Sequence, residues 1–199
     1  MSKTMRPALL GLSTCRDLLR EPLMTKVRDL LDALDGDNGE AALNAYTEIF
    51  YKLRQAGKTG LGDWLWDQLR YNESPYPALL DRGGSDPALE EAARRDTETL
   101  ARLAALDCGG LIDAMTALLP EEFQPVLAAL PRWSSHVPFT FESLTDFYQI
   151  HGAGLFARYR AFLWSGGALI PVAEPDTPQG GEMMGYGLLR EQVIANTRG

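Results

Sequence analysis

Apolar residues recur every three or four positions along most of this chain, the spacing that places them on one face of a helix. Such stripes predict helices over 23–34, 43–53, 61–69 and 87–106. Shorter stripes predict helical pieces over 111–119 and 121–130, and a longer one predicts a single helix from Thr140 to Leu163. The pattern therefore favours a body built almost entirely from helices.

The expected helix ends carry residues with known capping preferences. Asp86, which precedes a proline, and Thr140 are predicted N-caps, and Gly57 is a predicted C-cap. The segments 71–77 and 131–138 are predicted turns or loops, because they contain residues of the kind that interrupts helices, such as Pro, Asn and Ser. These boundaries separate the body into distinct packing elements.

Two glycine pairs carry further expectations. The helix that opens at Asp86 is expected to stop near Gly109 and Gly110. Gly152 and Gly154 fall inside the long predicted helix, where each costs roughly 1 kcal/mol relative to alanine. We expect a kink there, or the close approach of a neighbouring helix.

The pattern changes after Trp164. Gly166 and Gly167 are expected to end the long helix, 168–173 is predicted to be extended, and 174–182 has the composition of a linker. The sequence predicts a helical N-terminal domain over 1–167, a linker over 168–182 and a further helix within 183–199. The expected fold class is mostly α, an irregular multi-helix bundle followed by an extended linker and a C-terminal helix.

Composition and charge exclude several classes of partner. The 199 residues are 45% hydrophobic, enough for a buried core, and the net charge of -8 disfavours nucleic acid and anionic membranes as partners. No run approaches the roughly twenty apolar residues that span a bilayer. Cys15 and Cys108 cannot form a disulfide framework or a metal site by themselves, so we expect a reduced, cytoplasmic setting.

The tripeptide Gly57-Lys58-Thr59 resembles the end of a phosphate-binding P-loop. That loop requires another glycine five positions before Gly57, where Lys52 stands. The tripeptide also closes a predicted helix instead of following a strand. A helix C-cap at Gly57 is therefore the better interpretation.

The remaining reactive residues are few. His136 follows Ser134 and Ser135, but no nucleophile-elbow motif frames either serine. His151 lies on the apolar stripe of the long helix, which predicts a hydrogen-bonded core histidine. Cys108 is predicted to be a small buried residue at a helix end. A hydrolase that uses Ser134, Ser135 or Cys108 would rest on generic residues alone.

Four aromatic residues surround the predicted turn over 71–77. They are Trp64, Trp66, Tyr71 and Tyr76. These side chains could line a pocket or a partner groove, but aromatic burial favours core packing around the turn.

The last third of the chain carries the most specific motifs. In chain order these are 147–154, 156–164, 169–176, Met184-Gly185-Tyr186, 190–192 and 196–197. Together they resemble the domain-of-unknown-function family of predicted bacterial AAA+ ATPases (family eight-fifteen). The segments 72–76 and 96–100 fit that family more loosely, so the resemblance covers most of the chain and is specific from about Gly152 onward.

The resemblance implies a helical region, a linker and then a P-loop ATPase module that starts within 183–199. In AAA+ modules this stretch lies against the adenine, which makes Met184, Gly185 and Tyr186 candidate cofactor-binding residues. The alternative is that Gly185 only breaks the linker before the last helix. ATP and Mg²⁺ are the implied cofactors of the full-length protein. The chain itself lacks a Walker A loop, so no catalytic residue is assigned and no ATP hydrolysis is expected from it alone.

The predicted role of the helical body is to dock a protein partner or substrate onto the ATPase module. AAA+ modules assemble as rings, which implies a homo-oligomer when the motor is present. Recruitment of cargo and regulation of the motor both stay open. The alternative is a free-standing helical interaction or adaptor protein without catalytic activity, complete at 199 residues, with 183–199 packed back onto the body.

Overall fold

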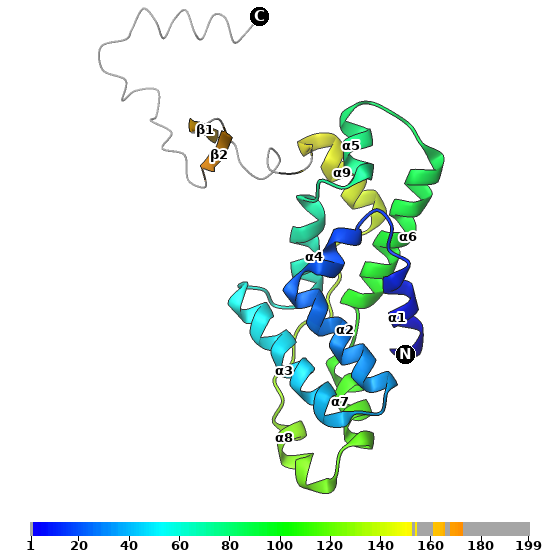
Figure 1. The fold of residues 1–199 in the computed structure, drawn as a ribbon, viewed down its shortest axis with the longest axis vertical. Coiled ribbons are helices and arrows are strands. Elements are labelled where there is room, and N and C mark those ends of the chain that lie inside the picture. The colour runs from blue at the N-terminus through cyan, green and yellow to red at the C-terminus, as the bar shows by residue number, and fades with distance from the viewer. Residues whose placement is uncertain (1, 153, 155–160, 166–167, 173–199) are drawn as a thin grey trace, which may run out of the picture. The chain divides into compact units, whose positions relative to one another are not determined.

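A computed structural model describes residues 2–152, 154, 161–165 and 168–172. The chain divides into two compact units, residues 1–158 and 159–199. The described part of the first unit contains nine α-helices and two short 3-10 helices (Figure 1). In order they are α1 (Ser2–Leu10), η1 (Arg16–Arg20), α2 (Pro22–Asp35), α3 (Gly39–Gln55), α4 (Leu61–Arg70), α5 (Pro75–Asp81), α6 (Pro87–Ala104), α7 (Cys108–Leu118), η2 (Glu121–Phe123), α8 (Gln124–Ala128) and α9 (Phe141–His151). The predicted mostly α fold class is confirmed.

The predicted caps form as expected. The Asp86 carboxylate accepts hydrogen bonds from the backbone N–H groups of Ala88 and Leu89 at 3.0 and 3.2 Å, so it satisfies two donors at the start of α6. Gly57 has a φ of +67° directly after the end of α3, and the next N–H donates to the carbonyl of Leu53 at 2.8 Å. A glycine fits this left-handed position without the strain that a Cβ would cause.

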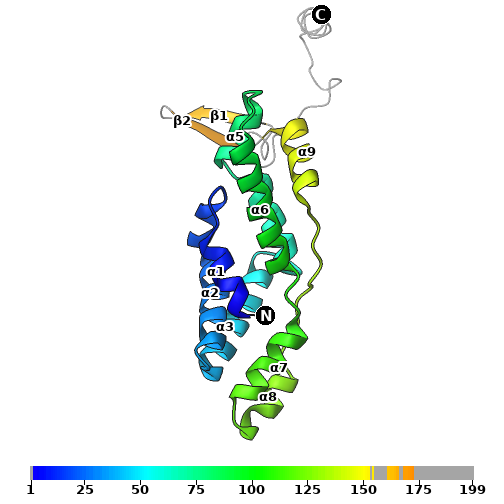
Figure 2. The ribbon, with the colours of Figure 1, turned by 90° about the vertical axis from the view of Figure 1, so that its right-hand side faces the viewer.

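Helix α6 is the central element of the first unit, because it packs against α1, α4, α5 and α9. Figure 2 shows α1 and α9 against different sides of α6. Helices α2 and α3 pack against each other, and α3 also contacts α7. The core between these helices is apolar, and its largest fully buried side chains include Tyr46, Leu9, Leu12, Met24, Leu30, Leu31, Ile49, Leu53, Leu61, Leu65, Leu69 and Leu100.

Two predicted boundaries differ from the structure. The turn expected over 71–77 ends early, because Pro75 starts α5, where a proline in the first turn is well tolerated. Gly109 and Gly110 do not end α6. They lie in the first turn of α7, whose start is capped by the Asp107 carboxylate accepting from the Gly110 N–H at 2.9 Å.

The single helix predicted from Thr140 to Leu163 is wrong in its second half. Helix α9 ends at His151, because Gly152 adopts a φ of +71°, a left-handed conformation that cannot continue a right-handed helix. Farther along, Ala161–Ser165 forms strand β1, which pairs antiparallel with β2 (Ala168–Val172). The extended segment predicted over 168–173 is therefore confirmed for the described residues 168–172. The expected linker over 174–182 lies outside the described residues.

Among the residues that the structure describes, no helix is both long and apolar enough to cross a bilayer.

Candidate functional site

The predicted nucleotide contacts lie outside the part of the chain that the structure describes. Met184, Gly185 and Tyr186 all fall in the range 173–199. Their role against an adenine therefore stays a prediction. The remaining candidate residues fall in the first unit, where their surroundings are defined.

The P-loop-like tripeptide has a structural role. The Lys58 ammonium forms an ion pair with the Asp67 carboxylate, and the Thr59 hydroxyl donates to Asp63. Arg70 also pairs with Asp67. Burial alone would raise the pKa of Asp67, but the hydrogen bonds from Lys58 and Arg70 outweigh it and lower that pKa. These contacts join the end of α3 to α4, as expected for a helix terminus.

The generic hydrolase residues are not arranged as a catalytic group. The Cys108 sulfur is buried and accepts a hydrogen bond from the Trp133 N–H at 3.3 Å. Cys108 is the first residue of α7, so the predicted buried position at a helix end is confirmed. The Ser134 hydroxyl accepts from the backbone N–H of His136 at 3.1 Å, and His136 itself is exposed. Among the described residues, no side-chain base is hydrogen-bonded to this hydroxyl.

The aromatic residues near α4 pack as predicted, but His151 does not. Trp64 and Tyr76 are buried, and Trp66 and Tyr71 are half-buried against the Phe147 ring of α9. His151 is exposed and lies with its ring centroid 4.8 Å from that of Phe147. The expected core histidine is therefore wrong, because α9 ends at this residue and leaves its side chain at the surface.

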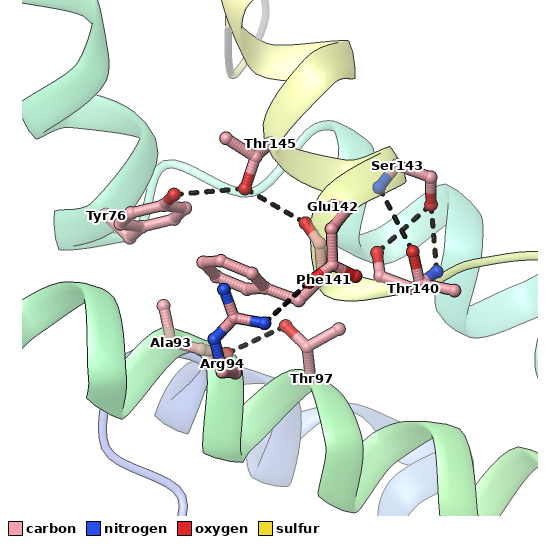
Figure 3. Close-up of polar contacts among 9 residues, drawn as sticks. All are labelled: Tyr76, Ala93, Arg94, Thr97, Thr140, Phe141, Glu142, Ser143 and Thr145. Carbon is pink, nitrogen blue, oxygen red and sulfur yellow. Dashed lines mark hydrogen bonds and ion pairs between the residues drawn. The ribbon is translucent and has the colours of Figure 1, made fainter.

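A polar network fastens the first turn of α9 to α6 and α5 (Figure 3). The Thr140 hydroxyl accepts from the Ser143 N–H at 3.2 Å, and the Ser143 hydroxyl accepts from the Thr140 N–H at 2.8 Å. This reciprocal arrangement is a capping box. On the adjoining side, Thr145 donates to the Phe141 carbonyl at 2.9 Å and lies 3.0 Å from the Tyr76 hydroxyl.

One ion pair joins α9 directly to α6 at the same place. The Arg94 guanidinium donates to the Glu142 carboxylate at 2.6 Å and covers the Phe141 ring, 4.2 Å from its centroid (Figure 3). The hydrogen bond from Arg94 lowers the pKa of Glu142. Both side chains are open to solvent, so the pair orients α9 more than it stabilises it.

Another side of α6 carries a buried acid. Asp96 is only 1% exposed, and its carboxylate oxygen Oδ2 accepts hydrogen bonds from the loop after α1. The donors are the N–H groups of Ser13 at 2.8 Å, Thr14 at 2.7 Å and Cys15 at 3.3 Å, with the Thr14 hydroxyl at 2.9 Å. A buried carboxylate is costly unless it is satisfied in this way. Asp96 thus anchors a loop that lies more than eighty residues earlier in the chain.

Cys15 belongs to the same anchored loop. It is 5% exposed, and burial raises the pKa of its thiol to about 12. A thiol with so high a pKa is almost entirely protonated at neutral pH and is a poor nucleophile. The loop therefore supplies hydrogen-bond donors to Asp96 and no reactive cysteine.

Beside Asp96, two hollows follow the line along which α1 packs on α6. The first has a volume of about 340 Å³ and is lined by Ala8, Gly11, Arg95, Asp96, Thr99 and Arg102. The second has a volume of about 290 Å³ and is lined by Thr4, Met5, Ala8, Arg102, Ala105 and Leu106. Ala8 and Arg102 line both hollows. We call the two together the α1–α6 groove.

Two arginines supply the positive charge of the α1–α6 groove. Arg102 donates to the Thr99 hydroxyl at 3.1 Å, and Arg95 is exposed. Neither takes part in an ion pair with an acidic side chain of the described residues. The groove therefore offers guanidinium donors that can bind a carboxylate or a phosphate.

Sequence reasoning did not single out the α1–α6 groove. Arg95, Thr99 and Arg102 stand at positions i, i+4 and i+7 of a predicted helix, which places them on one face. That signal was available in the sequence. The packing of α1 against the same face was not, because no local pattern pairs helices so far apart in the chain.

Comparisons with known proteins and the search for metal ligands add no assignment. No known protein family, no curated protein and no solved structure matches this chain. Among residues 2–152, no cluster of three or more His, Cys, Asp or Glu side chains is placed to hold a metal ion. The α1–α6 groove is therefore the candidate site with the best-defined geometry.

Proposed function

We propose that the helical unit is a docking domain that brings a protein partner or substrate to an AAA+-type ATPase module. Two features support the proposal. The motifs between Phe147 and Thr197 resemble such ATPases, and the body that precedes them is a bundle of packed helices. In this arrangement the bundle binds and the ATPase module supplies the chemistry.

The observation that carries the docking role is the contrast between engaged and available polar groups. Lys58, Thr59 and Cys108 each contact a neighbouring group of the fold. The guanidinium groups of Arg95 and Arg102 line an open groove, where Arg102 also donates to the Thr99 hydroxyl and neither forms an ion pair with an acidic side chain of the described residues. Available cations beside a hollow favour binding of a partner over catalysis by this unit.

ATP and Mg²⁺ belong to the ATPase module in this proposal. Met184, Gly185 and Tyr186 are the residues of this chain that would contact the adenine, the glycine by permitting close approach and the other two by apolar contact. The phosphate-binding loop and the acidic residue that holds Mg²⁺ would come from other parts of such a module. A homo-oligomer would form through the ATPase module.

The experiment is to read the gene beyond the codon for Gly199 and to assay the encoded protein. We expect a strand-like run followed by the G-x-x-x-x-G-K-[ST] motif, and ATP hydrolysis that the 199-residue chain alone does not show. Replacement of Tyr186 by alanine should then weaken binding of a fluorescent ATP analogue. A stop codon directly after Gly199 would contradict the ATPase assignment and would favour an adaptor without a motor.

Limited proteolysis of the 199-residue chain distinguishes the docking-domain proposal from the adaptor alternative. If 183–199 belongs to a separate module, we expect cleavage within 174–182 to release it early and leave a stable helical core. If the chain is an adaptor with that helix packed onto its body, the tail should resist cleavage as long as the core does. Mass spectrometry of the time course distinguishes the two results.

A further inference from the structure

The two ends of the α1–α6 groove differ in chemistry. At one end the exposed Arg95 presents hydrogen-bond donors, and Arg102, which donates to the buried Thr99 hydroxyl, lies where the two hollows meet. At the other end the lining is Thr4, Ala105 and the edges of Met5 and Leu106, whose side chains are mostly buried, so this end is largely apolar. A ligand that matches the whole groove therefore needs an anionic part and an apolar part.

The dimensions of the groove suit a short extended peptide. The lining on α6 and the residues that follow it runs from Arg95 to Leu106, about 16 Å at 1.5 Å per residue. An extended peptide covers this length with about five residues at 3.3 Å each. Ala8 and Gly11 contribute little side-chain bulk on the α1 wall, which leaves room for a backbone beside them.

The charges around the cationic end favour an acidic ligand although the chain as a whole carries -8. Asp96 also lines this end and keeps its negative charge, but its carboxylate is buried whereas Arg95 and Arg102 are exposed, so the three charged side chains of this lining leave a net positive charge. The carbonyls of Leu10 and Leu12, at and just beyond the end of α1, accept from Arg16 at 3.3 and 3.1 Å. The Arg16 guanidinium thus occupies two carbonyl oxygens at the C-terminal end of α1, where the helix dipole is negative.

We propose that the α1–α6 groove binds an extended segment of a protein partner that carries two acidic residues next to apolar ones. The acidic side chains pair with Arg95 and Arg102, and the apolar side chains lie between Met5 and Leu106. This inference rests on the proposed docking function and names the chemistry of the docked partner. Arginine suits the task because its planar guanidinium forms paired hydrogen bonds with a carboxylate.

Fluorescence anisotropy with a labelled peptide tests the proposal on the full 199-residue chain. The probe is fluorescein-Gly-Glu-Ala-Glu-Leu-Leu-amide, and its matched control carries glutamine in place of both glutamates. We expect saturable binding of the acidic peptide, and binding of the glutamine peptide that is at least roughly tenfold weaker. Added salt should weaken the acidic peptide more than the neutral one.

Variants of the protein locate the binding site. The double variant Arg95→Ser and Arg102→Ser should weaken binding roughly tenfold or more, because it removes both guanidinium groups. The control variant Arg82→Ser and Arg132→Ser removes two exposed arginines elsewhere and should leave the affinity unchanged. Ala8→Leu keeps the charge but fills the point where the two hollows meet, so it should also weaken binding. Circular dichroism confirms that each variant is folded.

Three results would overturn the proposal. They are no saturable binding of the acidic peptide at millimolar protein, equal weakening by the control variant, and binding of sodium dodecanoate at the same residues without binding of the peptide. The last result would assign the groove to an amphipathic lipid anion. If the gene encodes no ATPase module and its product still binds the peptide, only the proposed connection to an ATPase is refuted. The two proposals can therefore fail independently of each other.

Discussion

Two polar contacts of α6 hold distant parts of the chain, and they differ in their exposure to solvent. Toward α1, Asp96 is buried and its carboxylate accepts from the N–H groups of Ser13, Thr14 and Cys15. Toward α9, Arg94 pairs with Glu142, and the two side chains are 38% and 64% exposed. Arg94 and Asp96 are only two positions apart, yet water is excluded from the Asp96 hydrogen bonds and screens the Arg94–Glu142 ion pair.

From the contrast we expect burial, more than charge, to decide how strongly each contact stabilises the bundle. A carboxylate that replaces its water shell with backbone donors leaves those donors without partners if it is removed. An exposed ion pair loses little because water solvates both partners once they separate. We therefore expect the α1 side of α6 to depend on one residue, whereas the α9 side depends on a cap, an ion pair and ring packing together.

The largest effect is expected from Asp96→Ala. It leaves the buried donors of Thr14 and Cys15 without an acceptor and should lower the free energy of unfolding by about 3 kcal/mol. Urea unfolding followed by circular dichroism measures the change. Asp113→Ala, at an exposed position of α7, is the control and should shift stability by less than about 0.5 kcal/mol. Equal effects of the two substitutions would mean that Asp96 is not an anchor.

The reactivity of Cys15 reports opening of the same loop. The chain has two cysteines, so Cys108→Ala makes Cys15 the only thiol. In that background a disulfide reagent at pH 8 should label Cys15 slowly, because the folded thiol is buried with its pKa raised to about 12. Asp96→Asn should accelerate labelling at least roughly tenfold, the factor that 1.4 kcal/mol produces. An unchanged rate would show that the loop stays closed without the acid.

On the α9 side, Thr140→Ala removes half of the capping box. The Ser143 N–H then loses its acceptor at 3.2 Å, and stability should fall by about 1 kcal/mol. Thr47→Ala is the matched control, because Thr47 is an exposed residue inside α3 and alanine favours a helix interior. Stabilities from urea unfolding should therefore decrease only for Thr140→Ala. A decrease of the same size in both variants would contradict the role of the cap.

The smallest effect is expected from Glu142→Gln, and it should depend on pH. Arg94 lowers the folded-state pKa of Glu142, so the unfolded chain binds more protons in the acid range. The stabilisation is then present above the ordinary glutamate pKa and is lost as the pH falls through the lowered value. Urea midpoints of the two proteins should differ slightly at pH 7 and coincide at pH 2 or in 1 M salt. A difference that persists in acid would mean that packing, and not charge, holds α9.

The helices were largely predictable because their causes are local. The helical spacing of apolar residues and the capping residues predicted α2, α3, α4 and α6. The predicted continuation of α9 was wrong for a local reason as well, the conformation of Gly152. A glycine inside a helical pattern is compatible with a kink, a close contact or an end. Only the backbone conformation, with a φ of +71°, distinguishes them.

The candidate site was far less predictable than the helices. Arg95, Thr99 and Arg102 share one helix face in the sequence, but a row of polar residues is typical of any solvated surface. Asp96 stands next to Arg95 in the same predicted helix, yet it is 1% exposed. Its burial follows from the loop over 13–15, which lies more than eighty positions away, and local patterns hold no information about such a pairing.

The amino-acid sequence by itself determined the positions of α2, α3, α4 and α6, their apolar stripes and the caps at Asp86 and Thr140, because these depend on neighbours three or four positions away. The tertiary structure decided which polar residues of α6 are buried, which are tethered and which line the α1–α6 groove. Those outcomes depend on contacts between α6, α1 and α9, and on whether water or backbone donors surround each charge. A charged residue has the same local sequence in either case, so only the packed chain reveals its environment.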